Sequence, residues 1–189
     1  MPTAIVPAAG ASERFGGIKA VADVWGRPML ERVIDTLRAA EVDHIVVVLG
    51  DHEDSVRDNV PGLMSCRLVR NEHPERGMFS SLQVGFAAAP DETAYVVAIG
   101  DMPFVRPETV RALVAEHGRN GGIVSPRYRG KRGHPIVVDA AVRDAVLASP
   151  TTITLHDVIR TQSERRHDLD VDDPGVVRDV DTMKDLDNA

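Results

Sequence analysis

A glycine-rich loop with two cationic side chains follows the first apolar segment of the chain. Apolar residues dominate positions 3–9, and Gly10, Arg14 and Lys19 come directly after them. Small residues let backbone N–H groups approach anionic oxygens, and the two cations add charge that free amides lack. The loop therefore suits a polyphosphate, although an ordinary strand-to-helix connection with solvated cations would contain similar residues.

Two common phosphate-binding loops are excluded by the spacing. A Walker A loop needs a Gly-Lys-Ser/Thr sequence five places after its first glycine, but Phe15 stands there and Ala20 follows Lys19. A dinucleotide fingerprint needs two further glycines, at positions held here by Ser12 and Phe15. The pattern that remains is A-A-G-x-S-x-R-F-G-x-x-K.

A carboxylate with metal-binding potential stands after the most apolar strand candidate. Residues 94–99 are followed by Gly100, Asp101, Met102 and Pro103. A divalent cation is commonly held by one or two carboxylates together with phosphate oxygens, so Asp101 is a candidate Mg²⁺ ligand. The alternative is a plain turn, because glycine, aspartate and proline all favour turns.

A basic segment, residues 127–132, interrupts the acidic second half of the chain. It contains three arginines, one lysine and Gly130 between two strand-like runs. Such a segment can form a local anion site, and it can equally be a solvated hairpin tip. Gly133, His134 and Pro135 follow directly.

The elements that must position these residues alternate between strands and helices. We expect strands at 3–9, 44–49, 66–71, 94–99 and 122–126, and helices at 28–40, 80–88, 107–117 and 154–159. This order predicts an α/β fold with a doubly wound, mostly parallel Rossmann-like sheet, helices on both faces and a single domain over residues 1–189. After residue 159 we expect an irregular acidic tail, mostly solvated. Ligands of such sheets bind at the carboxyl ends of the strands, where the first loop and Asp101 should meet.

The first loop resembles the signature L-A-A-G-x-S-x-R-M-G-x-x-K of nucleotidyltransferases with the MobA-like fold. The resemblance implies that this loop wraps the triphosphate of an NTP, with Arg14 and Lys19 on the phosphates. Gly100-Asp101-Met102-Pro103 resembles the second motif of the family, in which the aspartate binds the metal. By this match the nucleotide-binding residues of the loop are Ala8, Ala9, Gly10 and Ser12, and the catalytic residues are Arg14, Lys19 and Asp101.

Three further segments resemble motifs of the same family. Residues 71–86 are similar to N-P-x-x-x-G-M-x-x-S-L-x-x-G, which implies that Gly77 and Ser81 contact the nucleotide base. Gly133-His134-Pro135 resembles the G-x-x-G-H-P motif on the acceptor side, so His134 is an acceptor-binding candidate without a role in proton transfer. Residues 178–186 resemble D-I-D-T-P-E-D-L, which implies a second metal ligand. We favour Asp181 for that role and keep Asp179 as the alternative, expecting one of the two to face the cleft.

The resemblance implies attack by an acceptor phosphate on the α-phosphorus of an NTP, with Mg²⁺ (or Mn²⁺) as cofactor and pyrophosphate as the leaving group. Ala8 and Ala9 are more similar to the cytidylyltransferase members, which favours CTP and an acceptor such as the molybdopterin cofactor. Those members usually have G-D-x-G-A-R where this chain has residues 154–159, so the acceptor stays open. Transfer to a sugar phosphate from GTP or UTP, an inactive nucleotide-binding module and a dinucleotide-dependent oxidoreductase are the alternatives.

Composition and net charge indicate which partners and which cellular compartment fit this activity. The net charge of −7 over 189 residues argues against nucleic acid as the partner, because such proteins usually have a basic face. Cys66 is the single cysteine and cannot form an internal disulfide, which fits a cytoplasmic protein. We see neither a signal peptide nor an apolar stretch of the roughly 20 residues that a membrane helix needs. The oligomeric state stays open.

Overall fold

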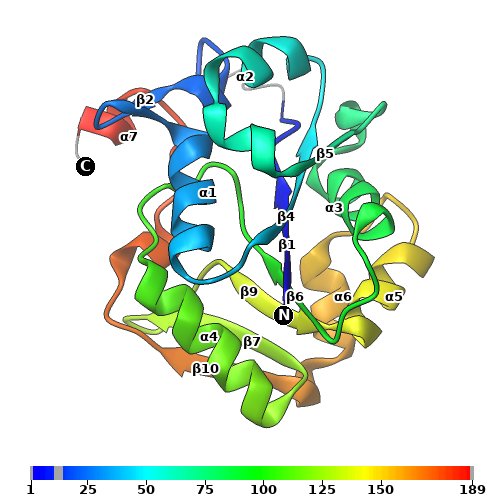
Figure 1. The fold of residues 1–189 in the computed structure, drawn as a ribbon. Coiled ribbons are helices and arrows are strands. Elements are labelled where there is room, and N and C mark those ends of the chain that lie inside the picture. Colours follow the sequence, from blue (N-terminus) through cyan, green and yellow to red (C-terminus); the bar gives the residue numbers. More distant parts are fainter. Residues whose placement is uncertain (1, 11–14, 188–189) are drawn as a thin grey trace.

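One sheet runs through almost the whole chain in the computed structural model, which describes residues 2–10 and 15–187 (Figure 1). Its strand order is β10-β7-β9-β6-β1-β4-β5, and β8 pairs with β7 outside this path. The strands are β1 (Thr3–Pro7), β4 (His44–Leu49), β5 (Arg67–Arg70), β6 (Ala94–Val97), β7 (Ile123–Tyr128), β8 (Lys131–Arg132), β9 (Ile136–Asp139) and β10 (Arg166–Asp170). A separate hairpin joins β2 (Asp23–Val24) to β3 (Arg27–Pro28).

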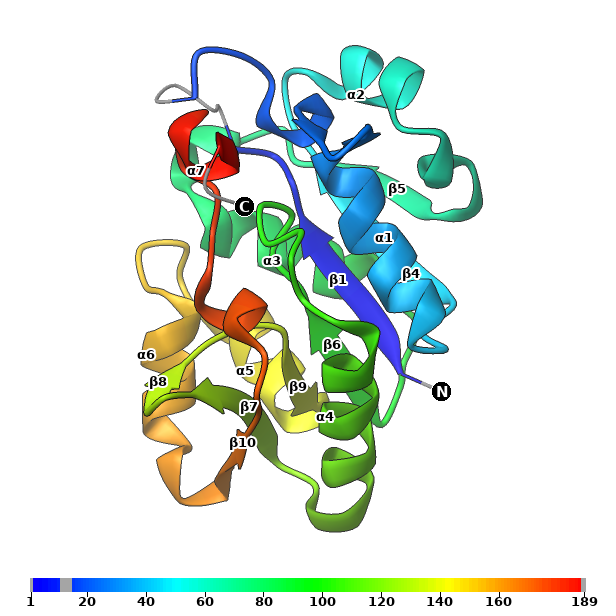
Figure 2. The same cartoon turned by 90° about the vertical axis from the view of Figure 1, so that its left-hand side faces the viewer.

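Helices lie on both faces of this sheet, as Figures 1 and 2 show. They are α1 (Met29–Ala39), α2 (Glu53–Asn59), α3 (Met78–Ala88), α4 (Pro107–Asn120), α5 (Ala140–Ala148), α6 (Leu155–Thr161) and α7 (Lys184–Asp187). The fold predicted from the sequence, a doubly wound and mostly parallel sheet, is confirmed. Among the described residues, no helix combines the length and the apolar character that crossing a bilayer requires.

The central strand β1 is buried along its whole length. It pairs in parallel with β4 on one side, where Ala4 is opposite Ile45, and with β6 on the other, where Ala4 is opposite Val96. Strands covered on both faces consist almost entirely of apolar residues, which is why this run does not alternate with polar positions. Because the three strands are parallel and adjacent, their carboxyl ends meet at one edge of the sheet.

Successive residues of β1 point into two different cores. Ala4 and Val6 pack with Leu30, Ile34 and other residues of the face covered by α1 and α4, while Ile5 packs with the face covered by α3 and α5. In α1 the side chains of Leu30, Ile34 and Leu37 are almost fully buried. Burying one such side chain stabilises a fold by about 1.5–3 kcal/mol, so α1 is held mainly by its apolar stripe.

The expected elements before residue 130 are close to those observed, and the later part of the chain is more regular than predicted. Helices α2 and α5 were not expected, and neither was β10, which pairs in parallel with β7 and is half-buried. The expectation of a mostly solvated tail after residue 159 is therefore wrong. The charged sequence Arg-His-Asp-Leu-Asp is not typical of a strand, but Asp168 and Asp170 form ion pairs with Arg132 of β8 and Arg127 of β7.

A buried carboxylate fixes the segment that follows β10. Asp173 is 2% exposed and accepts hydrogen bonds from the backbone N–H of Arg106, the hydroxyl of Thr109 and the backbone N–H of Gly175. A residue distant in sequence thereby supplies the hydrogen-bond acceptor for the Arg106 N–H and the Thr109 hydroxyl at the start of α4. This contact returns the chain toward the carboxyl ends of the strands, where residues 178–181 lie.

Close packing of α3 on the sheet leads to the first prediction. A Cβ atom at Gly85 would lie 2.5 Å from Cγ2 of Ile5 and 3.0 Å from Cγ2 of Val48. We expect Gly85→Ala to lower the free energy of unfolding by up to about 2 kcal/mol, because overpacking costs about 1–3 kcal/mol and better helix propensity returns about 1 kcal/mol. Urea denaturation measures the change.

The matched control is Gly118→Ala in α4, where a new Cβ would have no atom within 4 Å. We expect this variant to gain up to about 1 kcal/mol from helix propensity alone. Equal stability changes in the two variants would contradict the close packing of α3 on β1.

Candidate active site

Three strand ends converge at the edge of the sheet because glycines let their loops approach. A Cβ at Gly50, after β4, would lie 2.8 Å from the carbonyl oxygen of Ala9, and one at Gly100, after β6, would lie 3.2 Å from Cβ of Ala8. The backbone N–H of Ala8 donates to the carbonyl of Val48 at 2.8 Å, which extends the pairing of β1 past its end. Side chains at positions 50 and 100 would force these loops apart.

A cavity of about 650 Å³ opens above these ends. It brings together the loop after β1, the first turn of α3, the loop after β6 and the segment before α7. The lining residues are Pro7, Ala8, Ala9, Gly10, Phe15, Ile18, Lys19, Ala20, Gly50, Asp51, His52, Pro74, Gly77, Met78, Ser81, Ile99, Gly100, Asp101, Asp179 and Asp181. Among the site residues predicted from the sequence, Ala8, Ala9, Gly10, Lys19, Gly77, Ser81, Asp101 and Asp181 line it.

Lys19 joins two carboxylates in this cavity. Its Nζ atom lies 2.7 Å from Oδ2 of Asp101 and 3.2 Å from Oδ1 of Asp181. The side chain of Lys19 is only 16% exposed, so water screens these charges less than on an open surface. Two carboxylates share one ammonium at this place. These three groups could therefore also bind a cation.

The second carboxylate oxygen of Asp101 also favours the binding of a cation here. Oδ1 of Asp101 is buried and accepts no hydrogen bond from the described residues. An ionised carboxylate oxygen that is buried without a donor is costly, by about 1–3 kcal/mol or more. A cation bound beside Asp101 would remove that cost.

The turn that carries Asp181 is held by a nearby carboxylate. Oδ2 of Asp185 accepts hydrogen bonds from the backbone N–H groups of Asp181 and Thr182 and from the Thr182 hydroxyl. These bonds lower the pKa of Asp185 below its usual value, so the group is ionised at neutral pH. The backbone N–H of Val180 also donates to the carbonyl of Asp101 at 3.0 Å, which fixes the tail against the loop after β6.

Asp179 and Asp181 both line the cavity, whereas we expected only one of them to face it. The reason is that Val180 between them is fully buried, in an apolar cluster with Phe15, Val24 and Met29. Side chains two residues apart on an extended segment lie on the same side. Asp181 contacts Lys19, and Asp179 is the more exposed of the two.

A buried asparagine positions the hydroxyl of Ser81 at the start of α3. Asn71 is 2% exposed, and its Nδ2 donates to the hydroxyl oxygens of Ser80 and Ser81, both at 2.9 Å. Its Oδ1 accepts from the backbone N–H of His73. Because the Ser81 oxygen is used as an acceptor, its own proton is directed elsewhere. Gly77 precedes the helix with φ of +85°, a conformation that only glycine adopts easily.

His134 lies behind Asp101, and the described residues that line the cavity do not include it. Burial lowers the pKa of His134 below its ordinary value, against an opposing effect of Asp101, and Arg166 lowers it further. The imidazole is therefore uncharged at neutral pH and available for hydrogen bonding. Its backbone N–H donates to the carbonyl of Val176 at 2.8 Å, so the loop carrying it rests on the tail segment.

Two of the predicted site residues, Ser12 and Arg14, fall outside the described residues. Sequence reasoning in turn missed Asp51, His52 and Met78, which line the cavity, and Asn71, which supports it. A signal for Asp51 and His52 was present, because they follow Gly50 at the carboxyl end of a buried strand. Asn71 also stands at the carboxyl end of a strand, β5, but its supporting role depends on the helix that folds against it, which this position does not reveal.

The family model described as "MobA-like NTP transferase domain" matches residues 4–168, most of the chain. The chain belongs to this family. The family resemblance inferred from the loop motifs is thereby confirmed, and the match spans every strand of the sheet up to the middle of β10.

Individual relatives carry different activities in their names. Nicotine blue oxidoreductase of Paenarthrobacter nicotinovorans is 33% identical over 97% of this chain and 94% of its own length. A protein of Natronomonas pharaonis named "probable molybdenum cofactor guanylyltransferase" is 30% identical over 99% of this chain and 96% of its own.

The structure of Rv0371c from Mycobacterium tuberculosis superimposes with a TM-score of 0.86 at 29% identity, covering 100% of this chain and 97% of that one. A second structure of Rv0371c, in complex with manganese, has a TM-score of 0.76 at 25% identity, covering 98% and 96%. The likeness spans the whole described fold, including the tail that returns to the cavity.

The second prediction concerns the support of Ser81. Asn71→Leu keeps the approximate volume but leaves two serine hydroxyls and one backbone N–H without their buried partner. Each such group costs about 1–3 kcal/mol, so we expect the free energy of unfolding to fall by roughly 2 kcal/mol or more. Urea denaturation measures it, with Asn59→Leu as the control.

Asn59 is exposed and donates only to the carbonyl of Ser55 within α2. We expect its replacement to change stability by less than about 0.5 kcal/mol. Similar losses in both variants would mean that the hydrogen bonds of Asn71 contribute no more to the free energy of unfolding than the exposed one of Asn59.

Proposed function

We propose that the protein is a Mg²⁺-dependent nucleotidyltransferase that moves an NMP, with CTP as the favoured donor, to a phosphorylated small-molecule acceptor such as the molybdopterin cofactor. The observation that carries the proposal is the contact of Lys19 with both Asp101 and Asp181 in a cavity at the carboxyl ends of β1, β4 and β6. An ammonium and two carboxylates at such a place match what a triphosphate and its cation need.

The reaction requires positioning and charge neutralisation rather than a protein nucleophile. An oxygen of the acceptor phosphate attacks the α-phosphorus, the bond from that phosphorus to the bridging oxygen breaks, and pyrophosphate leaves with the electron pair. Lys19 binds the phosphate oxygens and stabilises the charge that grows on the leaving group, and Arg14 does so from the same loop. Neutral His134 contributes hydrogen bonding on the acceptor side.

The carboxylates present fit a divalent cation that is shared with the substrate. Asp101 has a buried oxygen without a donor, and Asp181 lies on the other side of Lys19. Among the described residues, no group of three or more His, Cys, Asp or Glu side chains could hold a metal, so oxygens of the NTP must complete the coordination. Mg²⁺ or Mn²⁺ bound there would neutralise phosphate charge, and the manganese complex of Rv0371c supports this assignment.

The donor base is assigned to the side of the cavity formed by Gly77 and Ser81. The Ser81 hydroxyl accepts from Asn71, which leaves its proton for a base. The run Ala8-Ala9-Gly10 resembles the cytidylyltransferases, because guanylyltransferases tend to have glycine in place of the second alanine, Ala9. The methyl groups of Ala8 and Ala9 favour the smaller pyrimidine. The guanylyltransferase name of the Natronomonas relative supports GTP as the alternative donor.

An oxidoreductase is the second candidate, because the relative from Paenarthrobacter nicotinovorans has that name at 33% identity. The broken dinucleotide fingerprint of the first loop speaks against it, and so does the pairing of Lys19 with two carboxylates. Thermal-shift screening of the four NTPs with Mg²⁺, and of NADH and NADPH, separates the two functions. Stabilisation by the dinucleotides alone would replace the proposed transferase with the oxidoreductase.

The third prediction concerns the metal carboxylates. Asp101→Asn keeps the shape and removes a charge from the cation's surroundings, so we expect turnover to fall by roughly a hundredfold or more. Pyrophosphate release measures it, using whichever of a panel of phosphorylated acceptors gives the highest rate with the wild type. Asp181→Asn should behave similarly and Asp179→Asn more mildly.

The control is Asp144→Asn on the exposed side of α5, which should keep normal turnover. A folded Asp101→Asn variant with near-normal turnover would remove Asp101 from the mechanism. A greater loss at Asp179 than at Asp181 would exchange the roles of these two residues.

The fourth prediction concerns donor selectivity. A purine in place of the pyrimidine must lose the hydrogen bonds of the base site or press on the methyl groups of Ala8 and Ala9. Because each buried polar group left unpaired costs about 1–3 kcal/mol, we expect CTP to bind roughly tenfold or more tightly than GTP. Calorimetric titration with Mg²⁺ present measures both affinities. Equal or tighter GTP binding would assign the protein to the guanylyltransferases.

A further inference from the structure

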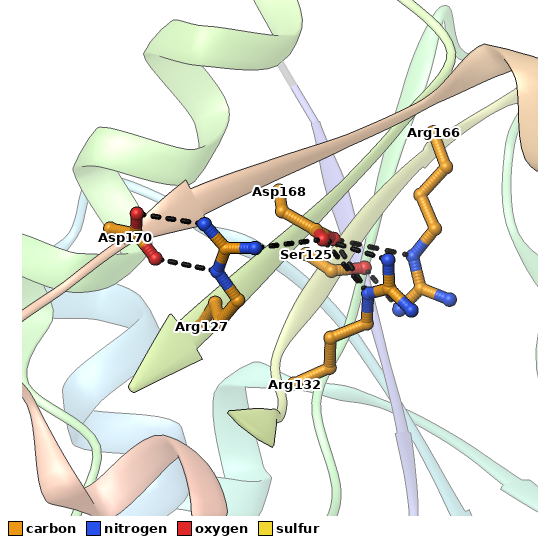
Figure 3. Close-up of polar contacts among 6 residues, drawn as sticks. All are labelled: Ser125, Arg127, Arg132, Arg166, Asp168 and Asp170. Atoms are coloured by element: carbon orange, nitrogen blue, oxygen red, sulfur yellow. Dashed lines mark hydrogen bonds and ion pairs between the residues drawn. The ribbon is translucent and has the colours of Figure 1, made fainter. Parts of the chain in front are cut away.

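Three arginines and two aspartates form a cluster across the outer strands β7, β8 and β10 (Figure 3). Its members come from parts of the chain that are about 40 residues apart in sequence: Ser125, Arg127, Arg132, Arg166, Asp168 and Asp170. The register aligns them, because Asp168 is opposite Ser125 and Asp170 is opposite Arg127 in the parallel pair of β10 and β7. We name these six residues the arginine cluster.

Two of the three guanidinium groups are matched by the two carboxylates. Arg127 donates to both oxygens of Asp170, at 2.6 and 2.9 Å, in a two-bond contact. Arg132 contacts both oxygens of Asp168 at 2.8 Å, through Nε and Nη2. Paired contacts of this kind use the full acceptor geometry of a carboxylate. One positive charge, on Arg166, is therefore left with only a share of Asp168.

Arg166 is poorly compensated and largely buried. Its side chain is 15% exposed, and Nε lies 3.6 Å from Oδ1 of Asp168, too far for a hydrogen bond. Nη2 donates to the hydroxyl of Ser125 at 2.9 Å, while Nε has no hydrogen-bond partner among the described residues. Burial and the neighbouring Arg132 lower the pKa of Arg166, against an opposing effect of Asp168. An anion at this point would relieve the repulsion between the two guanidinium groups.

The arginine cluster lies on the acceptor side of the proposed active site. Arg132, at the end of β8, stands two residues before His134, the acceptor-side candidate. The backbone N–H of Gly133 between them donates to the carbonyl of Pro126 in β7 at 2.9 Å, and the backbone N–H of His134 donates to the carbonyl of Val176 at 2.8 Å. The tail that contains Val176 continues to Asp179 and Asp181, which line the cavity. The cluster is therefore joined to the wall of the cavity through the loop that carries His134.

We propose that Arg166, with Arg132 beside it, binds the anionic phosphate of the acceptor. Two adjacent guanidinium groups attract a phosphate dianion by their charge, and Nε of Arg166, which has no hydrogen-bond partner among the described residues, can donate to one of its oxygens. Arg132 keeps its two-bond contact with Asp168. Asp168 holds both groups in place, and Arg127 with Asp170 closes the outer side. This inference rests on the proposed transferase function and extends it to Arg132, from the basic segment 127–132, and to Arg166, which no motif pointed to.

The test uses inorganic phosphate as the probe, with the donor site kept filled. A CTP analogue with a methylene group between the α- and β-phosphorus, together with Mg²⁺, occupies the triphosphate loop and cannot react. Phosphate is then titrated by calorimetry into the wild-type complex and into Arg166→Ala and Arg166→Lys. We expect Arg166→Ala to weaken phosphate binding at least about tenfold and Arg166→Lys to restore part of it, because a charged hydrogen bond is lost or kept.

Arg57→Ala is the matched control, since Arg57 is an exposed arginine of α2 that pairs with Glu53 of the same helix. It should bind phosphate as the wild type does. All variants should bind the analogue equally, which also shows that they are folded. Undiminished phosphate binding in Arg166→Ala, or no phosphate binding to the wild-type complex, would overturn the inference. Failure of the wild type to bind any NTP analogue would instead overturn the proposed function.

Discussion

The parallel alignment of β1 with β4 and β6 is the constraint on which the rest of the molecule depends. These three strands are buried on both faces, so their pairing cannot slip without exposing apolar side chains to water. Their carboxyl ends must therefore stop together, and each end contributes backbone to the same cavity. Glycines at positions 50 and 100 complete the arrangement, because they let loops of neighbouring strands touch.

The charged side chains at the carboxyl ends of these strands then determine which ligands can bind there. Lys19 and Asp101 are 82 positions apart in the chain, and Lys19 and Asp181 are 162 apart, yet one ammonium contacts both carboxylates. The contact exists because Asp173 and the turn at Asp185 bring the tail back across the sheet. The tail thus supplies charge to a site whose other lining residues lie between positions 7 and 101.

Much of the fold could be predicted from the sequence because its signals are local. The apolar run 44–49 coincides with β4, and the amphipathic pattern of 28–40 differs from α1 by one residue at each end. Asp101 and Lys19 carried motif signals. Asn71, Asp173 and Arg166 did not, because each acts through partners that are distant in sequence or belong to elements formed only on folding. Strand β10 was missed because alternating charges hide an edge strand whose polar groups are paired.

Close packing at Gly133 connects the loop that carries His134 to the tail of the chain. A Cβ there would lie 1.7 Å from the carbonyl oxygen of Val176, so the loop before β9 rests directly on the tail segment 174–177. A shift of the loop that carries His134 must displace this segment and, a few residues later, Asp179 and Asp181. In the proposed transferase, acceptor occupancy and metal affinity would then be linked thermodynamically, and by reciprocity each would change the other by the same factor.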